Sequence, residues 1–154
     1  VCENFILTKL DNVPFDIEKS RELTEQAFKD RNPERLIEAI TYFPLNGLAW
    51  FNYGVYLKDN NDYENAFIAF LTAACIQDWD KEAWKNCFLI SFNLNKQDEL
   101  LFIYNVILNK FGIESVNYIA EHLFKDPHLE KETKIELIKV FSDLATIRKQ
   151  IDDK

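Results

Sequence analysis

The chain has 154 residues, a mass of 18.2 kDa, a net charge of −8 and a pI of about 4.8. One domain of this length buries about two-thirds of its unfolded surface, and 47% hydrophobic residues exclude a disordered chain. Because an acidic surface repels phosphate groups and no apolar run reaches membrane-spanning length, we expect neither nucleic-acid binding nor membrane insertion.

The three cysteines, Cys2, Cys75 and Cys87, are an odd number without the spacing of a disulfide framework. We therefore expect reduced thiols and a cytoplasmic protein. The first residues lack the basic region of a secretory signal, and the absence of Met leaves open whether the chain is a fragment or a processed form.

Along the chain, residues 1–15 could form a short helix or an extended arm. Beyond them, apolar residues recur at three- and four-residue spacing, which is typical of amphipathic helices. This spacing predicts helices at 16–29, 33–42, 48–57, 63–76, 83–94, 98–110, 113–124 and 130–151. The last of these has an apparent apolar stripe of Ile135, Ile138, Phe141, Leu144 and Ile147.

An internal repeat connects the central helices. The pair Ala49-Trp50 recurs as Ala83-Trp84, and Asn52 recurs as Asn86 at the same interval. A period of this length, about 34 residues, is typical of helix-turn-helix repeats. We therefore expect Trp50 and Trp84 to be buried at equivalent contacts between helices.

The segment 48–77 resembles a tetratricopeptide repeat (TPR). Its matching residues are Trp50, Tyr53-Gly54, Ala66, Phe70 and Ala73, with Leu57 at an aromatic position; Ala39 and Pro44 close the preceding repeat. The next repeat keeps Trp84 but has Phe88 and Leu100 in place of Gly54 and Ala66. Larger residues at these two positions predict a helix pair that packs further apart or crosses at another angle.

The resemblance implies an all-α fold, a right-handed superhelix of antiparallel helix pairs with a C-terminal capping helix. We expect a single domain with an N-terminal arm at 1–15, a divergent repeat at 16–46, repeats at 47–80 and 81–112, and a divergent repeat with the capping helix at 113–154.

TPR domains are protein-interaction scaffolds whose first helices line a concave groove. By alignment, the groove here would be lined by Phe51, Asn52, Val55, Lys85, Asn86, Leu89 and Phe92. Three of them, Phe51, Leu89 and Phe92, could instead belong to the core. Lys85, Asn86 and Asn52 also match part of the clamp with which some TPR domains hold a terminal carboxylate.

The predicted partner is a protein or peptide, amphipathic or basic because the chain is acidic. Size, acidity and architecture also resemble the class II chaperones of type III secretion, which hold an amphipathic client. A helical enzyme is a more remote alternative, and the oligomeric state stays open.

No residue pattern predicts catalysis, a metal site or a cofactor. His122 and His128 are separated by five residues, whereas two helical metal ligands require a spacing of four positions. The acidic turn at 59–64 lacks the glycine and the closing glutamate of a calcium loop. We therefore expect a scaffold or adaptor and not an enzyme.

Overall fold

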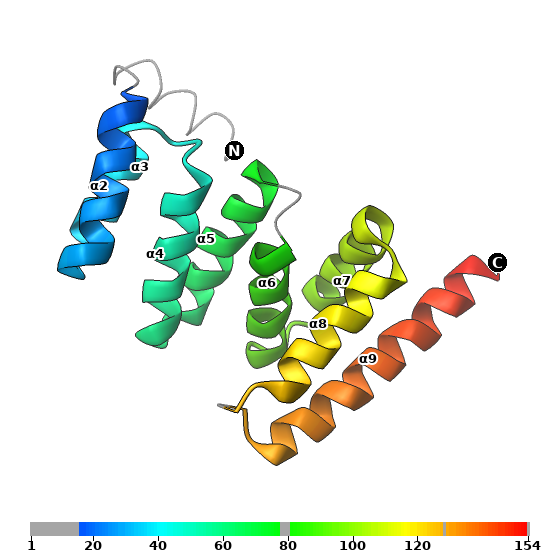
Figure 1. Ribbon diagram of the computed structural model, residues 1–154. Helices are drawn as coiled ribbons and strands as arrows, with labels where there is room; N and C mark the ends of the chain where they lie inside the picture. Colours follow the sequence, from blue (N-terminus) through cyan, green and yellow to red (C-terminus); the bar gives the residue numbers. More distant parts are fainter. Residues whose placement is uncertain (1–15, 78–80, 128, 154) are drawn as a thin grey trace. The chain divides into compact units, whose positions relative to one another are not determined.

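The computed structural model describes residues 16–77, 81–127 and 129–153. These residues form eight helices with no strand among them (Figure 1). Every helix predicted from the sequence is present, with each end within two residues of its expected position. The expected arm at 1–15 lies outside the described residues. Among those that are described, no helix has both the length and the apolar character needed to cross a membrane.

The helices belong to two compact units that divide after Leu94. The first unit contains α2 (Ile17–Asp30), α3 (Glu34–Tyr42), α4 (Gly47–Asp59), α5 (Tyr63–Ile76) and α6 (Lys81–Asn93). The second contains α7 (Gln97–Phe111), α8 (Ile113–Lys125) and α9 (Lys131–Asp152). The division falls inside the segment 81–112, which the sequence predicts as one repeat.

In the first unit, α2 packs on α3 and α4 packs on α5 as antiparallel pairs, with α3 against α4 and α5 against α6 (Figure 1). Short polar turns separate the members of each pair. Arg31 and Asn61 adopt positive φ angles of 52° and 61° in these turns. Asp16 and Asp62 cap the helices α2 and α5, because their side chains accept hydrogen bonds from backbone N–H groups of the first turn.

Small residues of the repeat motif allow the helices of the first unit to approach closely. Ala39, Ala66 and Ala73 are almost fully buried. Gly54 lies directly against the ring of Phe70, where an added Cβ would meet ring carbons at 3.0 Å. These residues therefore serve packing, as the TPR resemblance implies.

The two repeated tryptophans are not equivalent. Trp84 is 3% exposed, as predicted. Trp50 is only half-buried, and its indole Nε1–H donates a hydrogen bond to the carbonyl oxygen of Pro44 at 2.8 Å. The prediction of equal burial is therefore wrong for Trp50, since this indole must keep its polar edge beside the α3–α4 connection.

In the second unit, Gly112 ends α7 and begins α8 with a φ of 82°, a backbone conformation that favours glycine. The stripe predicted for α9 is partly wrong. Leu144 is buried, but Leu137 is its buried companion, while Ile135 and Ile138 are about half exposed. Leu137 and Leu144 are seven residues apart and lie on one helix face, from which Ile135 points away.

Candidate functional site

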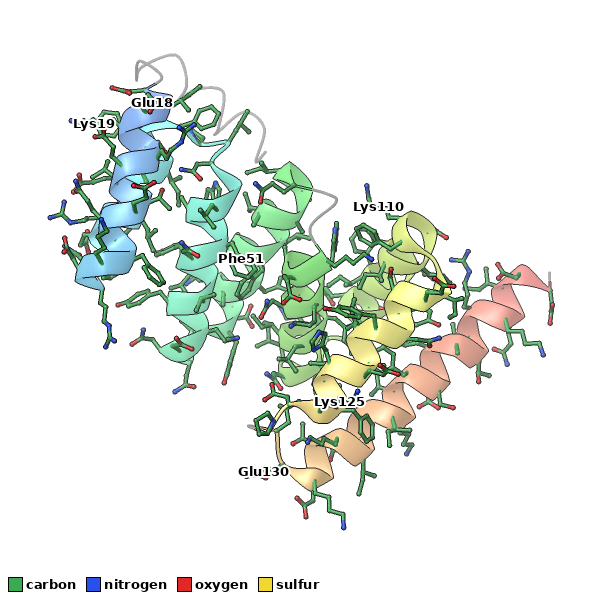
Figure 2. All side chains as sticks on the ribbon, viewed as in Figure 1. Glu18, Lys19, Phe51, Lys110, Lys125 and Glu130 are labelled. Atoms are coloured by element: carbon green, nitrogen blue, oxygen red, sulfur yellow. The ribbon has the colours of Figure 1, made fainter. Side chains whose placement is uncertain are left out.

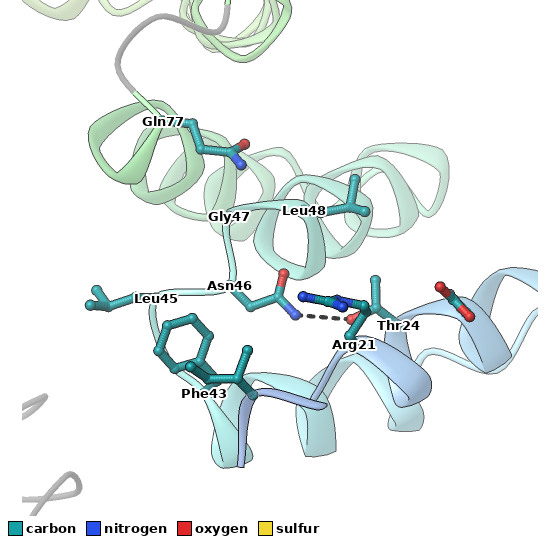
Figure 3. A pocket seen from close by; sticks show the side chains of 10 residues that line it. Arg21, Thr24, Phe43, Leu45, Asn46, Gly47, Leu48 and Gln77 are labelled. Atoms are coloured by element: carbon teal, nitrogen blue, oxygen red, sulfur yellow. Dashed lines mark hydrogen bonds between the residues drawn. The ribbon is translucent and has the colours of Figure 1, made fainter. Parts of the chain in front are cut away.

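Two hollows lie side by side along α2 and α4, and together we call them the α2–α4 groove. The first has a volume of about 420 Å³ and is lined by Ile17, Arg21, Thr24, Glu25, Phe43, Leu45, Asn46, Gly47, Leu48 and Gln77 (Figure 3). The second has a volume of about 720 Å³ and is lined by Ala27, Phe28, Lys29, Arg31, Asn32, Pro33, Leu36, Asn52, Val55, Tyr56 and Asp59.

The lining shows how the two helices run. The beginning of α2 and the beginning of α4 line the first hollow, while the end of α2 and the end of α4 line the second. The helices are therefore parallel, with the first hollow at their N-terminal ends and the second at their C-terminal ends. This is the arrangement expected for the first helices of successive helix pairs.

Exposed apolar side chains concentrate in the groove. Of the large hydrophobic residues exposed in the described part of the first unit, five line the two hollows: Ile17, Phe28, Leu45, Leu48 and Tyr56. Phe28 has the most exposed side chain among them, at 83%. Several exposed apolar side chains gathered at hollows are typical of interaction sites, whereas single exposed hydrophobic residues are ordinary.

A buried polar network fixes the wall of the first hollow. The Asn46 amide donates a hydrogen bond to Thr24 Oγ1 at 3.1 Å (Figure 3) and another to Ser20 Oγ at 2.9 Å. Ser20 in turn donates to the Ala39 carbonyl oxygen at 2.6 Å. Asn46 also caps α4, since its Oδ1 accepts a hydrogen bond from the Ala49 N–H at 3.0 Å. One asparagine thereby holds α2, α3 and α4 in register.

The two hollows differ in charge. At the first hollow, Arg21 forms an ion pair with Glu18 at 3.4 Å, and Glu25 is a second acid on its wall. The second hollow has two cations, Lys29 and Arg31, and one acid, Asp59. Its rim therefore carries a net positive charge in a chain whose net charge is −8.

Two of the residues predicted to line the groove, Asn52 and Val55, line the second hollow. Phe51 is half-buried, and its ring lies edge-on to that of the buried Phe70, with 5.3 Å between centroids and an interplanar angle of 72° (Figure 2). Phe51 thus contributes to the core contact between α4 and α5, the alternative that the sequence left open.

The other predicted residues lie on α6. Lys85 forms an ion pair with Glu82 at 2.7 Å. Asn86 is buried, and it donates to the Glu82 carbonyl oxygen at 2.9 Å and accepts from Lys58 Nζ at 3.4 Å. Leu89 and Phe92 are half-buried on the same helix. The side chains of Lys85 and Asn86 therefore already interact with other residues of the protein.

Among the described residues, the second unit and the cysteines Cys75 and Cys87 show no reactive arrangement. His122 Nε2 lies 2.6 Å from Tyr118 Oη, with both side chains exposed, and His128 lies outside the described residues. Burial raises the pKa of the Cys87 thiol well above its usual range, and the nearby Cys75 adds to this rise. Within the described ranges, no three His, Cys, Asp or Glu side chains gather where they could hold a metal ion.

The sequence did not predict the contribution of α2. Phe28 follows four polar or small positions in a mostly polar helix, so it does not complete an apolar stripe. The repeat period does contain a signal, since Ser20 precedes Gly54 by the same interval that separates Trp50 from Trp84. Extending the repeat alignment backwards would have placed α2 beside α4.

Comparison with solved structures shows the fold. The chain is similar to the first TPR of Spaghetti (RPAP3), which was solved bound to the HSP90 peptide SRMEEVD. The TM-score is 0.55 at 18% sequence identity, covering 85% of this chain and 97% of the other. No protein-family model matches the sequence, and no curated protein matches it. The protein therefore has the TPR-like helical-repeat fold that its sequence predicts.

Proposed function

We propose that this protein is an interaction module that binds an amphipathic segment of a partner protein in the α2–α4 groove. The observation that carries the proposal is the concentration of exposed apolar side chains along both hollows. Burying such a side chain contributes about 1.5–3 kcal/mol to binding before ordering costs are subtracted. The protein thus acts as a scaffold or adaptor through this surface.

The fold supports the same proposal. The structurally similar TPR of Spaghetti binds a peptide, which shows that helix pairs arranged in this way can present a peptide-binding surface. In this protein, Asn52 and Val55 would contact the partner directly. Leu89 and Phe92 would contact it only if the bound segment is long enough to extend to α6.

A clamp for a terminal carboxylate is less well supported. Such a clamp needs cationic and amide groups that are free to donate hydrogen bonds. The Lys85 ammonium is neutralised by Glu82 at 2.7 Å, and the Asn86 amide donates to a backbone carbonyl. The apolar groove is therefore the stronger basis for binding.

The adaptor and the secretion chaperone would use this groove in the same way but for different clients. A chaperone keeps soluble a client segment that aggregates alone, whereas an adaptor binds a segment that is soluble by itself. Light scattering of the isolated client, with and without the protein, separates these two functions.

Affinity capture from the native cells, with a groove variant as a matched comparison, tests the proposal. The variant Leu48→Ser with Val55→Ser removes apolar surface from both hollows, while Ile68→Ser removes an exposed apolar side chain from α5. We expect one protein to be captured by the wild type and by Ile68→Ser but not by the groove variant.

The captured protein would then be divided into overlapping synthetic peptides and titrated against the wild type. We expect at least one peptide to bind the wild type and Ile68→Ser but not the groove variant. Capture that is insensitive to the groove variant would contradict the proposal.

A further inference from the structure

We infer that the segment bound in the α2–α4 groove is an amphipathic helix whose acidic residues lie at the second hollow, beside Lys29 and Arg31. This inference rests on the proposed function and specifies the partner. Two independent observations carry it, the spacing of the two hollows and the difference in their charge.

The spacing of the hollows matches two turns of a helix. On α2, Arg21 lines the first hollow and Phe28 the second; on α4, Leu48 and Val55 do the same. Both pairs are seven residues apart, which corresponds to about 10 Å along a helix axis. A partner helix with apolar groups about 10 Å apart on one face would therefore contact both hollows.

A helix meets this spacing with residues two turns apart. Residues i and i+7 of a helix share a face at about 10 Å, with i+3 or i+4 between them. Residues on one face of a strand are separated by about 7 or 13 Å. A helix lying between the parallel α2 and α4 also follows the ordinary geometry of helix-in-groove recognition.

The charge of the rim determines the polar residues of the partner. Lys29 and Arg31 are exposed and form no ion pair with any described residue, while Asp59 is the one acid among the residues that line the second hollow. At the first hollow, Arg21 is already paired with Glu18. Acidic side chains of a bound helix therefore find complementary charge only at the second hollow.

The net charge of the chain favours a basic partner, and the groove favours an acidic one at this position. Complementarity is decided where charges approach within a few ångströms, because salt screens charges beyond about 8–10 Å. The acidic turn that follows α4 affects the approach of a partner, while Lys29 and Arg31 lie beside the hollow that would receive it.

A library of phage-displayed random 16-residue peptides tests the inference before any partner is identified. The library is selected on the wild-type protein and depleted on the variant Phe28→Ser with Val55→Ser. We expect the enriched peptides to have apolar residues at i, i+3 or i+4 and i+7, together with Asp or Glu near the i+7 end.

A synthetic peptide of the enriched sequence is then titrated by fluorescence anisotropy. Lys29→Glu with Arg31→Glu should weaken binding at least tenfold, and replacing the acidic residues of the peptide by lysines should restore it. Lys139→Glu with Lys149→Glu, exposed on α9, makes the same change in net charge and should leave binding within twofold. Circular dichroism of each variant checks that its helices are retained.

The outcomes separate the inference from the proposed function. Groove-dependent peptides with basic residues at the i+7 end, or with alternating apolar residues, would overturn the inference and leave the proposed function standing. If no peptide is enriched once the library has been depleted on the groove variant, both are overturned.

Discussion

The side chain of Asn46 donates a hydrogen bond to Ser20 Oγ at 2.9 Å, joining the residue before α4 to the first turn of α2. Ser20 lies one repeat period before Gly54, so the structure uses the same repeat position in two ways. In the α4–α5 pair the position is a glycine against a ring. In the α2–α3 pair it is a hydroxyl that donates to Ala39 and accepts from Asn46.

Replacing Asn46 by alanine should destabilise the protein. The change removes the α4 cap and leaves the buried hydroxyl of Ser20 with one partner fewer, which we expect to cost about 1–3 kcal/mol in the free energy of unfolding. Urea denaturation followed by circular dichroism measures this loss. Asn117→Ala, at an exposed position on α8, should change stability by less than about 0.5 kcal/mol. Equal stability of both variants would show that the network contributes nothing.

Gly54→Ala should also be destabilising, although alanine is the better helix former by about 1 kcal/mol. The new methyl group would lie 3.0 Å from ring carbons of Phe70, which is fully buried and held by Phe51. Overpacking of this kind costs about 1–3 kcal/mol.

A double-mutant cycle with Phe70→Leu checks the cause. Because a smaller side chain gives the methyl group room, the double variant should be more stable than the sum of the single effects predicts. Strict additivity would place the strain somewhere other than the contact between Gly54 and Phe70.

The tryptophans should differ in their contribution to stability. Trp84→Ala removes a side chain that is 3% exposed and should cost about 3–5 kcal/mol. Trp50→Ala should cost about half as much, because that indole is half-buried and loses one hydrogen bond to Pro44. Guanidinium denaturation of the two variants compares them directly. A larger loss from Trp50→Ala would contradict the observed difference in burial.

The sequence predicts features that depend on neighbouring residues better than features that depend on distant contacts. The helix positions follow from apolar spacing and from polar turns, and all of them are confirmed. The predicted apolar stripe of α9 was partly wrong. Ile135 and Leu137 both fit a helical spacing with other apolar residues of α9, so the sequence does not show which of them is buried. Packing against the rest of the second unit buries Leu137. The burial of Trp50 likewise depends on the path of the chain at Pro44.

The candidate site was predicted on one of its two helices. Asn52 and Val55 were found because the TPR motif fixes the register of α4. The opposite wall was missed because Phe28 and Arg31 stand at the end of a mostly polar helix, where no periodic pattern marks them. The positive charge at the rim of the second hollow was also not predicted, because the net charge of the whole chain is negative.

Thiol labelling should distinguish the cysteines. In a Cys2→Ser background, the exposed Cys75 should react with iodoacetamide at pH 8, whereas Cys87 should react only after unfolding. The pKa of Cys87 is raised by burial, so the folded protein resists ionising it. Folding should therefore lose stability as the pH rises above the ordinary thiol value of 9.0, where the unfolded thiol ionises first.

Two variants test whether Cys87 causes this loss of stability. Cys87→Ala should weaken the loss of stability at alkaline pH, and Cys75→Ser should not. Rapid labelling of Cys87 in the folded protein would show that its site opens to solvent.

Phe28 and Phe51 should separate binding from folding. Phe28→Ser removes an exposed ring from the second hollow and should leave the melting temperature within about 2 °C while abolishing binding of a groove-dependent peptide. Phe51→Ser removes a ring that contacts Phe70 and should lower the melting temperature by several degrees. If Phe28→Ser unfolds the protein and Phe51→Ser does not, the assignment of these two residues is reversed.

The central claim is that the surface between α2 and α4 receives the partner. Titration of the ¹⁵N-labelled protein with a groove-dependent peptide, followed by the shifts of backbone amide resonances, tests this claim most directly. The account predicts that the largest shifts fall within α2 and α4, including Arg21, Phe28, Leu48 and Val55. Large shifts confined to α5 or to the second unit, with α2 and α4 unchanged, would contradict it.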